Sequence, residues 1–251
     1  MKPIEKALIL RKSARLRSRE PMRLFRRRLR EPERILGIIE GSEAPESSKQ
    51  EARRQYLVAV CAAFESFWRE FVRVSVDRHR VPRATLDALR GASFTIGELQ
   101  SVLGRKLSLG ELISCSYSFQ GPDAVNSALS DILQFKVFSE FGSARFAVRE
   151  VPRKKSPKGR LLLNTEIAGT DILKRTLPAM QKAYTIRHDT VHNTGASHRV
   201  AEREVWTIGN AAWELNTLLG MHLEGKFDQL WGRPRRSVQP EHRTHPTTAA
   251  R

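Results

Sequence analysis

Cysteines and long apolar runs are scarce in this sequence. Only two cysteines occur among the 251 residues, Cys61 and Cys115, and each lies in an apolar or small-residue stretch. Two isolated cysteines indicate neither a disulfide framework nor a cysteine-based zinc site, and a reducing cytoplasm fits this composition best. No run approaches the roughly 20 apolar residues that span a bilayer, so we expect no membrane partner.

Acidic residues are also in deficit. There are 27 Asp and Glu residues against 44 Lys and Arg residues, which gives a formal net charge of +17. Such an excess of positive charge predicts an acidic partner, and nucleic acid is the commonest one for a chain this basic. The charge alone identifies no chemistry.

The chain is long enough for one large domain or two small ones. Residues 1–48 alternate Arg with Leu, Ile and Phe and then become small and acidic, which predicts a basic helical arm, broken at Pro21 and Pro32, and a linker. Residues 49–231 are expected to form a helical domain. Residues 232–251 are rich in Pro, Thr, His and Arg and predict a disordered basic tail.

Apolar residues at three- and four-residue intervals predict four long helices, over 51–79, 122–142, 170–192 and 201–227. A short helix is expected over 85–89, whereas residues 108–119 fit a strand or a helix. Trp206 and Trp213 are interpreted as core residues. Four long helices joined by irregular insertions favour an all-α helical bundle.

The third of these helices ends in a group of residues suited to chemistry on a phosphodiester. Arg187 is a fixed cation, and His188 and His192 can titrate near neutral pH. In RNA cleavage the 2′-hydroxyl loses a proton as it attacks phosphorus and the leaving 5′-oxygen gains one. His192 could exchange these protons while Arg187 stabilises the added negative charge. This scheme uses no metal and no cofactor, fails on DNA and leaves a 2′,3′-cyclic phosphate.

Helical geometry constrains this site. Residues five apart lie about 140° apart around a regular helix, so Arg187 and His192 would not share a face. Two arrangements remain open: the helix ends before His192, or a second copy of the chain completes the site across a two-fold interface.

These residues resemble a known motif. Arg187-x4-His192, with the polar His188 directly after the Arg, is similar to the Arg-polar-x(3–5)-His signature of the HEPN superfamily. The stretch 183–193, with a helix on either side, is similar to the RiboL-PSP form of that motif. The stretch 60–69 resembles the aromatic-rich first helix of that form, with an inward acidic residue at Glu65.

The resemblance implies a HEPN-like helical bundle, a homodimer and a metal-independent endoribonuclease of a toxin–antitoxin or antiviral defence system. It implies catalytic roles for Arg187 and His192, a supporting role for His188 and a further one for Glu65. Other members of the superfamily have lost activity and only bind RNA or nucleotides. The basic arm, the insertion over 91–121 and the Lys-rich loop over 151–160 inherit nothing from it.

Simpler interpretations stand beside this one. Arg and His at a helix C-terminus often satisfy the last carbonyl groups and the helix dipole. His188 and His192, with Asp189 adjacent, also have the spacing of a zinc-binding pair, but the sequence offers no third ligand. Glu65 could be a partly buried acid that simply pairs with an Arg.

The expected partners are RNA, a second copy of the chain, and an antitoxin or defence-system protein. We expect Asn193, Arg153, Lys154 and Lys155 to contact RNA, unless they belong to solvated faces. The alternatives to an enzyme are a catalytically silent RNA- or nucleotide-binding subunit and a scaffold for a partner enzyme.

Overall fold

A computed structural model describes residues 21–79, 81–82, 85–86, 100, 104, 107–149, 164–192 and 199–232. This part is mostly helical, which confirms the all-α prediction in its coarse form. Its elements, in chain order, are α2 (Pro21–Glu40), α3 (Glu46–Arg78), α6 (Leu109–Ser116), α7 (Pro122–Leu133), α8 (Val137–Ser143), β1 (Arg145–Arg149), β2 (Asn164–Ala168), α9 (Gly169–His192) and α10 (Glu202–Trp231). Among the helices within these ranges, none has the length and apolarity needed to cross a membrane.

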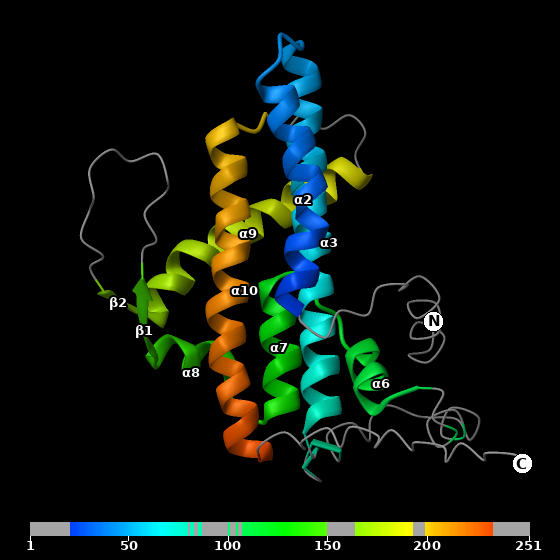
Figure 1. Cartoon of the computed structure of the whole chain (residues 1–251), viewed down its shortest axis with the longest axis vertical. Coiled ribbons are helices and arrows are strands. Elements are labelled where there is room, and N and C mark those ends of the chain that lie inside the picture. Colours follow the sequence, from blue (N-terminus) through cyan, green and yellow to red (C-terminus); the bar gives the residue numbers. More distant parts are fainter. Residues whose placement is uncertain are drawn as a thin grey trace, which may run out of the picture.

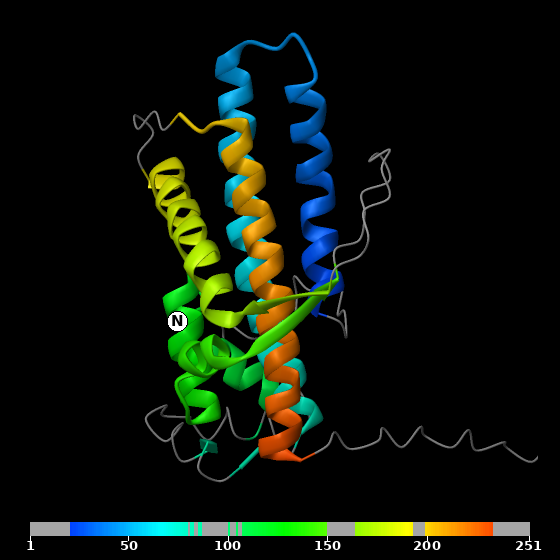
Figure 2. The same ribbon diagram turned by 90° about the vertical axis from the view of Figure 1, so that its left-hand side faces the viewer.

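Helix α3 lies at the centre of the bundle and confirms the helix predicted over 51–79. Helices α2, α6, α9 and α10 all pack against it, and α2, α3 and α10 run side by side along the long axis (Figures 1 and 2). Its core stripe is aromatic, with buried Phe64, Phe67, Trp68 and Phe71 in mutual edge or stacked contact. Burial of these large side chains, each worth about 1.5–3 kcal/mol or more, makes α3 the element on which the others assemble.

Helix α2 differs from the expected arm. It begins at Pro21 and continues through Pro32 to Glu40, so the break predicted at Pro32 is wrong. Its apolar residues Phe25, Leu29 and Leu36 are buried, and the Phe25 ring meets the edge of Phe67 with centroids 6.2 Å apart. Because these apolar positions fall on one face, residues 21–40 form part of the core, and their arginines lie on the outside.

The chain between α3 and β1 is also more broken than expected. Residues 109–116 are helical, and Ser108 and Glu111 form a reciprocal capping box at the start of α6. The helix predicted over 122–142 is wrong in its extent, because Gln134 adopts a positive φ of 62° and separates α7 from α8. Side chains compensate for the break: Ser130 accepts a hydrogen bond from the Val137 amide, and Asn126 accepts one from the Phe138 amide.

A two-stranded antiparallel ribbon was not predicted. Strands β1 and β2 pair from Arg145 opposite Ala168 to Arg149 opposite Asn164, and the basic segment over 151–160 between them lies outside the described residues. Strand β2 leads directly into α9 at Gly169. A Cβ atom at Gly169 would lie 1.8 Å from the Phe141 carbonyl oxygen, so this contact between α8 and α9 requires glycine.

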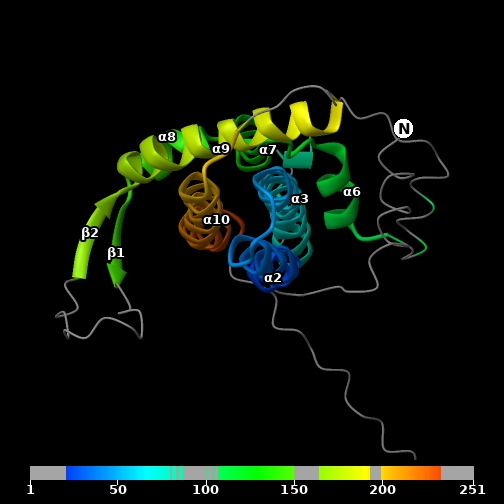
Figure 3. The same cartoon turned by 90° about the horizontal axis from the view of Figure 1, so that it is seen from above.

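Helices α9 and α10 confirm the last two predicted helices. Seen from above, α9 lies across α3 and α10 (Figure 3), with α7 and α8 beneath it (Figure 2). Trp206 is half-buried against Tyr56, but Trp213 is 44% exposed, so the interpretation of Trp213 as core is wrong. The inward stripe of α10 passes through Ala212 and leaves Trp213 on the outer face. Most of the short helix predicted over 85–89, and the tail beyond residue 232, lie outside the described residues.

Candidate functional site

Arg187 of α9 and Glu65 of α3 form an ion pair and a hydrogen bond between Nη1 and Oε1. The Arg187 side chain is 28% exposed and that of Glu65 is 13% exposed, so the pair sits at the edge of the core. Glu65 is thus the partly buried acid paired with an Arg that the sequence allowed. Its partner is the Arg at the start of the motif, so α3 and α9 bring two candidate residues together.

The surroundings favour the charged form of Arg187. Burial alone would lower the pKa of the Arg187 guanidinium, but the Glu65 carboxylate outweighs burial and the pKa is raised. The nearby Cys61 thiol is neutral, since burial raises its pKa to about 12. Burial also raises the pKa of Tyr184, whose hydroxyl donates to the Cys61 carbonyl oxygen at 3.4 Å. The Arg187 Cζ atom lies 5.7 Å from the centre of the Tyr184 ring, within range of a cation–π contact.

The two imidazoles lie together on the outside of α9. His188 and His192 are one turn apart and both exposed, and their ring centroids are 4.9 Å apart with an interplanar angle of 49°. An exposed pair of this kind can reach a ligand without any change in the core. Arg187, in contrast, reaches across to α3, where it donates a hydrogen bond to Glu65.

Helix α9 continues through His192, which excludes an arrangement in which the helix ends before that residue. Arg187 and His192 therefore point about 140° apart, and His188 lies between them, about 100° from Arg187. Around the axis of α9, the side chains of one protein chain therefore follow one another in the order Arg187, Tyr184, His188 and His192. It does not place Arg187 and His192 on one face.

The zinc interpretation receives no third ligand. Within the residues that the structure describes, no three His, Cys, Asp or Glu side chains are grouped so that they could hold a metal ion. Among the described residues, His188 and His192 are therefore two possible ligands without a third. The expected RNA contacts Asn193, Arg153, Lys154 and Lys155 all lie outside the described residues.

Further basic groups lie outside the motif, on the predicted basic stretch that forms α2 and on α3. Arg23, Arg26, Arg27 and Arg30 are exposed along α2. On α3, the buried Nε of Arg69, one turn beyond Glu65, has no hydrogen-bond partner among the residues that the structure describes. The alternation of Arg with apolar residues in the sequence was the available signal for α2; the position of Arg69 depends on the packing of α3.

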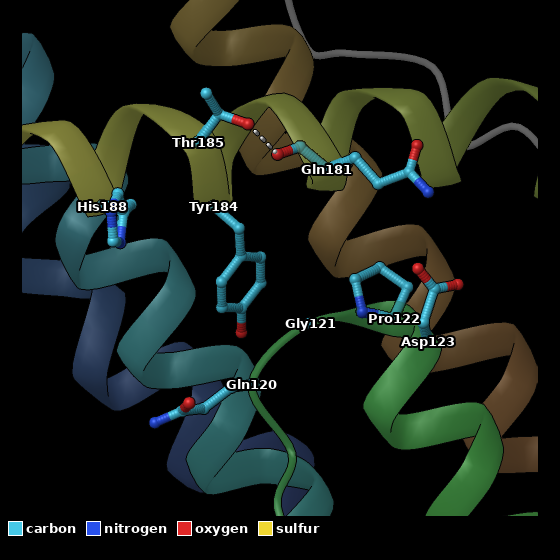
Figure 4. A pocket seen from close by; sticks show the side chains of 8 residues that line it. All are labelled: Gln120, Gly121, Pro122, Asp123, Gln181, Tyr184, Thr185 and His188. Atoms are coloured by element: carbon cyan, nitrogen blue, oxygen red, sulfur yellow. Dashed lines mark hydrogen bonds between the residues drawn. The ribbon is translucent and has the colours of Figure 1, made fainter.

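An open pocket of about 430 Å³ lies beside the imidazoles, between α9 and the start of α7. Figure 4 shows Tyr184 pointing from α9 towards Gly121, with His188 and Gln120 on one side and Gln181 and Asp123 on the other. Gly121 has a φ of +107°, which favours glycine and turns the chain into α7. Sequence reasoning missed this pocket because residues 120–123 come roughly sixty positions before the α9 residues that line it, 181–188.

Comparison with protein-family models, with curated proteins and with solved structures finds no match to this chain.

Proposed function

We propose that this protein is a metal-independent endoribonuclease of the HEPN type, with its site at the C-terminal end of α9. One observation carries the proposal: the Arg187–Glu65 ion pair lies on the same turns of α9 as the exposed His188–His192 pair. A held guanidinium beside two solvent-facing imidazoles is a set of groups that suits transfer at a phosphodiester.

The chemistry requires two proton transfers and one charge to be stabilised. One neutral imidazole takes the proton of the 2′-hydroxyl as its oxygen bonds to phosphorus. A protonated imidazole gives a proton to the 5′-oxygen as the P–O5′ bond breaks, and a 2′,3′-cyclic phosphate remains. His192 is the principal proton-transfer group, with His188 beside it. Arg187 stabilises the phosphorane, and Glu65 is a positioning residue that holds the guanidinium.

A second copy of the chain completes this site in our proposal. Since α9 is helical through His192, one chain turns Arg187 and His192 in different directions, and a two-fold axis near the end of α9 can bring one residue of each chain to the same phosphate. Val191, which is 55% exposed next to His192, would lie in such an interface.

The remaining parts of the proposal concern setting and substrate. An endoribonuclease of this type would act in the cytoplasm, in a toxin–antitoxin or antiviral defence system, with an antitoxin or defence protein as a partner. The net charge of +17 and the basic face of α2 support RNA as the ligand.

The experiment incubates highly purified full-length protein with RNA and with DNA of the same sequence, with and without EDTA, and identifies the product ends. We expect cleavage of RNA only, no effect of EDTA and 2′,3′-cyclic phosphate ends. Arg187→Lys and His192→Asn should each lower the rate by about 10²- to 10³-fold.

The matched control is Arg175→Lys, since Arg175 also pairs with a glutamate, Glu214, but on the exposed side of α9. Its rate should equal that of the wild type. If the wild type binds RNA but does not cleave it, the protein is an RNA-binding module and not an enzyme. Loss of cleavage in EDTA would instead favour a metal-dependent site.

A further inference from the structure

The pocket between α9 and α7 combines an aromatic floor with unused polar side chains. Tyr184 and Pro122 provide apolar surface, and the side chains of Gln120, Gln181 and Asp123 form no hydrogen bond with another described residue. The volume of about 430 Å³ falls in the range of small-molecule sites, about 300–1,000 Å³. An aromatic ring surrounded by amide groups and a carboxylate suits a flat heterocycle that stacks on the ring and forms hydrogen bonds along its edge.

We propose that this pocket binds one unpaired guanine base of the RNA, stacked on Tyr184, and so selects the nucleotide at the cleavage site. The inference rests on the proposed function for the identity of the ligand as RNA. It adds a base-recognition site and named selecting residues that the Arg–His motif does not contain.

The two ends of the pocket give the nucleotide a direction. His188 lines one end and its ring contacts His192, so this end adjoins the proposed proton-transfer groups. Asp123 and Gln181 lie at the other end (Figure 4). A base stacked between these ends turns its ribose and phosphate towards the imidazoles and its hydrogen-bonding edge towards Asp123.

The carboxylate of Asp123 explains why we expect guanine and not another base in this pocket. An ionised carboxylate only accepts hydrogen bonds. Guanine carries an N1–H and an N2 amino group side by side, so both carboxylate oxygens can be satisfied. Adenine and cytosine place a ring-nitrogen lone pair beside their amino group, and uracil places one N–H between two carbonyl groups. Each of these bases would face Asp123 with a lone pair, and a well-formed pair of bonds discriminates by roughly ten- to a hundred-fold.

Asp123 also has an ordinary structural interpretation, because an acidic residue in the first turn of a helix stabilises the helix dipole. The two interpretations differ in what a neutral amide would change. Asp123→Asn would cost a little stability under either one. Only base recognition predicts a change that depends on which base is bound.

The test measures equilibrium binding of GMP, AMP, CMP, UMP and ribose 5-phosphate to the full chain. We expect GMP to bind most tightly, and Asp123→Asn to weaken GMP roughly ten-fold while ribose 5-phosphate stays unchanged. The matched control is Asp131→Asn, an exposed aspartate near the other end of α7, which should behave as wild type. Tyr184→Phe, which keeps the ring, should retain GMP binding, whereas Tyr184→Leu should lose it.

Equal binding of the four nucleotides, or GMP binding unaffected by Asp123→Asn, would overturn the inference. A second readout maps the base at each cleaved position in a random RNA. Guanine-selective GMP binding without any RNA cleavage would refute the proposed ribonuclease function but support the guanine-binding pocket. RNA cleavage without guanine preference, unchanged by Asp123→Asn, would support the ribonuclease function but refute the guanine-binding pocket.

Discussion

The guanidinium of Arg187 is bound to the carboxylate of Glu65 across 122 positions of sequence, and this contact joins α9 to the central helix of the bundle. Both residues lie at the margin of the core, so their charges are screened less than those of surface pairs. The pair therefore contributes to folding as well as to any chemistry at the end of α9.

The first prediction separates these two contributions. Arg187→Ala leaves Glu65 partly buried without its partner, so we expect the free energy of unfolding to fall by about 1–2 kcal/mol, measured by urea denaturation. Glu65→Gln keeps a hydrogen-bond acceptor and should cost less stability than Arg187→Ala while still slowing RNA cleavage. Arg175→Ala, on the exposed pair with Glu214, should change stability by less than about 1 kcal/mol. Equal losses for Arg187→Ala and Arg175→Ala would contradict this ranking.

The second prediction concerns α2, which the sequence suggested was a free arm. Phe25→Ala removes a buried ring that meets Phe67 and should lower the free energy of unfolding by about 3–5 kcal/mol. Replacement of Arg26, Arg27 and Arg30 by Gln should leave stability almost unchanged, because all three side chains are exposed.

The triple Gln variant, which should keep its stability, should bind RNA less tightly. Each lost phosphate contact lowers the slope of log affinity against log salt by about 0.7, so the triple Gln variant should have a flatter slope. An unchanged slope would assign the basic face of α2 to some other purpose. Deletion of residues 1–40 is a poorer test, since it removes part of the core together with the charges.

The third prediction uses the pH dependence of stability. Burial and then Lys226 lower the pKa of His222, which Glu140 only partly opposes, and the ring packs on Phe141 and Phe146. The folded state therefore prefers the neutral imidazole. Above the unfolded pKa of about 6.5 the contribution is complete, and it is lost as pH falls and the unfolded chain takes up the proton first.

Melting temperatures measured between about pH 7.5 and pH 5 should show this loss. The wild type should lose more stability over that range than His222→Gln, in which no proton is taken up. Parallel curves for the two proteins would show that other groups account for the acid sensitivity.

The fourth prediction tests the two-chain site. Arg187→Ala and His192→Ala proteins, each inactive alone, should recover part of the activity when they are mixed and allowed to exchange, because one composite site then contains an intact Arg187 and an intact His192. Val191→Glu places a charge on the exposed apolar contact at the end of α9 and should favour monomers in sedimentation experiments. A wild-type protein that is monomeric at its working concentration would rule out this arrangement.

The sequence predicted the periodic part of this protein well. Three of the four long apolar stripes became α3, α9 and α10, and the remaining one became α7 and α8, since a stripe at helical spacing can be buried in only a few ways. Prediction from the sequence failed where contacts between residues distant in the chain determine the local structure. Gln134 divides a predicted helix because Ser130 and Asn126 satisfy the freed amides, and strands β1 and β2 are too short to show a pattern.

The candidate site was predictable to the same degree. Arg187, His188 and His192 stand within six positions of one another, so a motif suffices to find them. The resemblance named Glu65 as well, but only the packing of α3 on α9 identifies Arg187 as its partner. Gln120 and Asp123 enter the pocket through the turn at Gly121, and no local pattern connects that turn with α9.

The glycine at the start of α9 has a consequence for the far end of that helix. Gly169 sits against the Phe141 carbonyl oxygen, and Arg187 follows 18 residues later, about 27 Å along the axis. A side chain at Gly169 would have to push the helix start away from α8. A tilt of about 5° there would carry the guanidinium through about 2 Å, enough to part it from Glu65. The contact of Gly169 with α8 therefore sets the position of Arg187, and the proposed cleavage should respond to substitutions at Gly169, far from the end of α9.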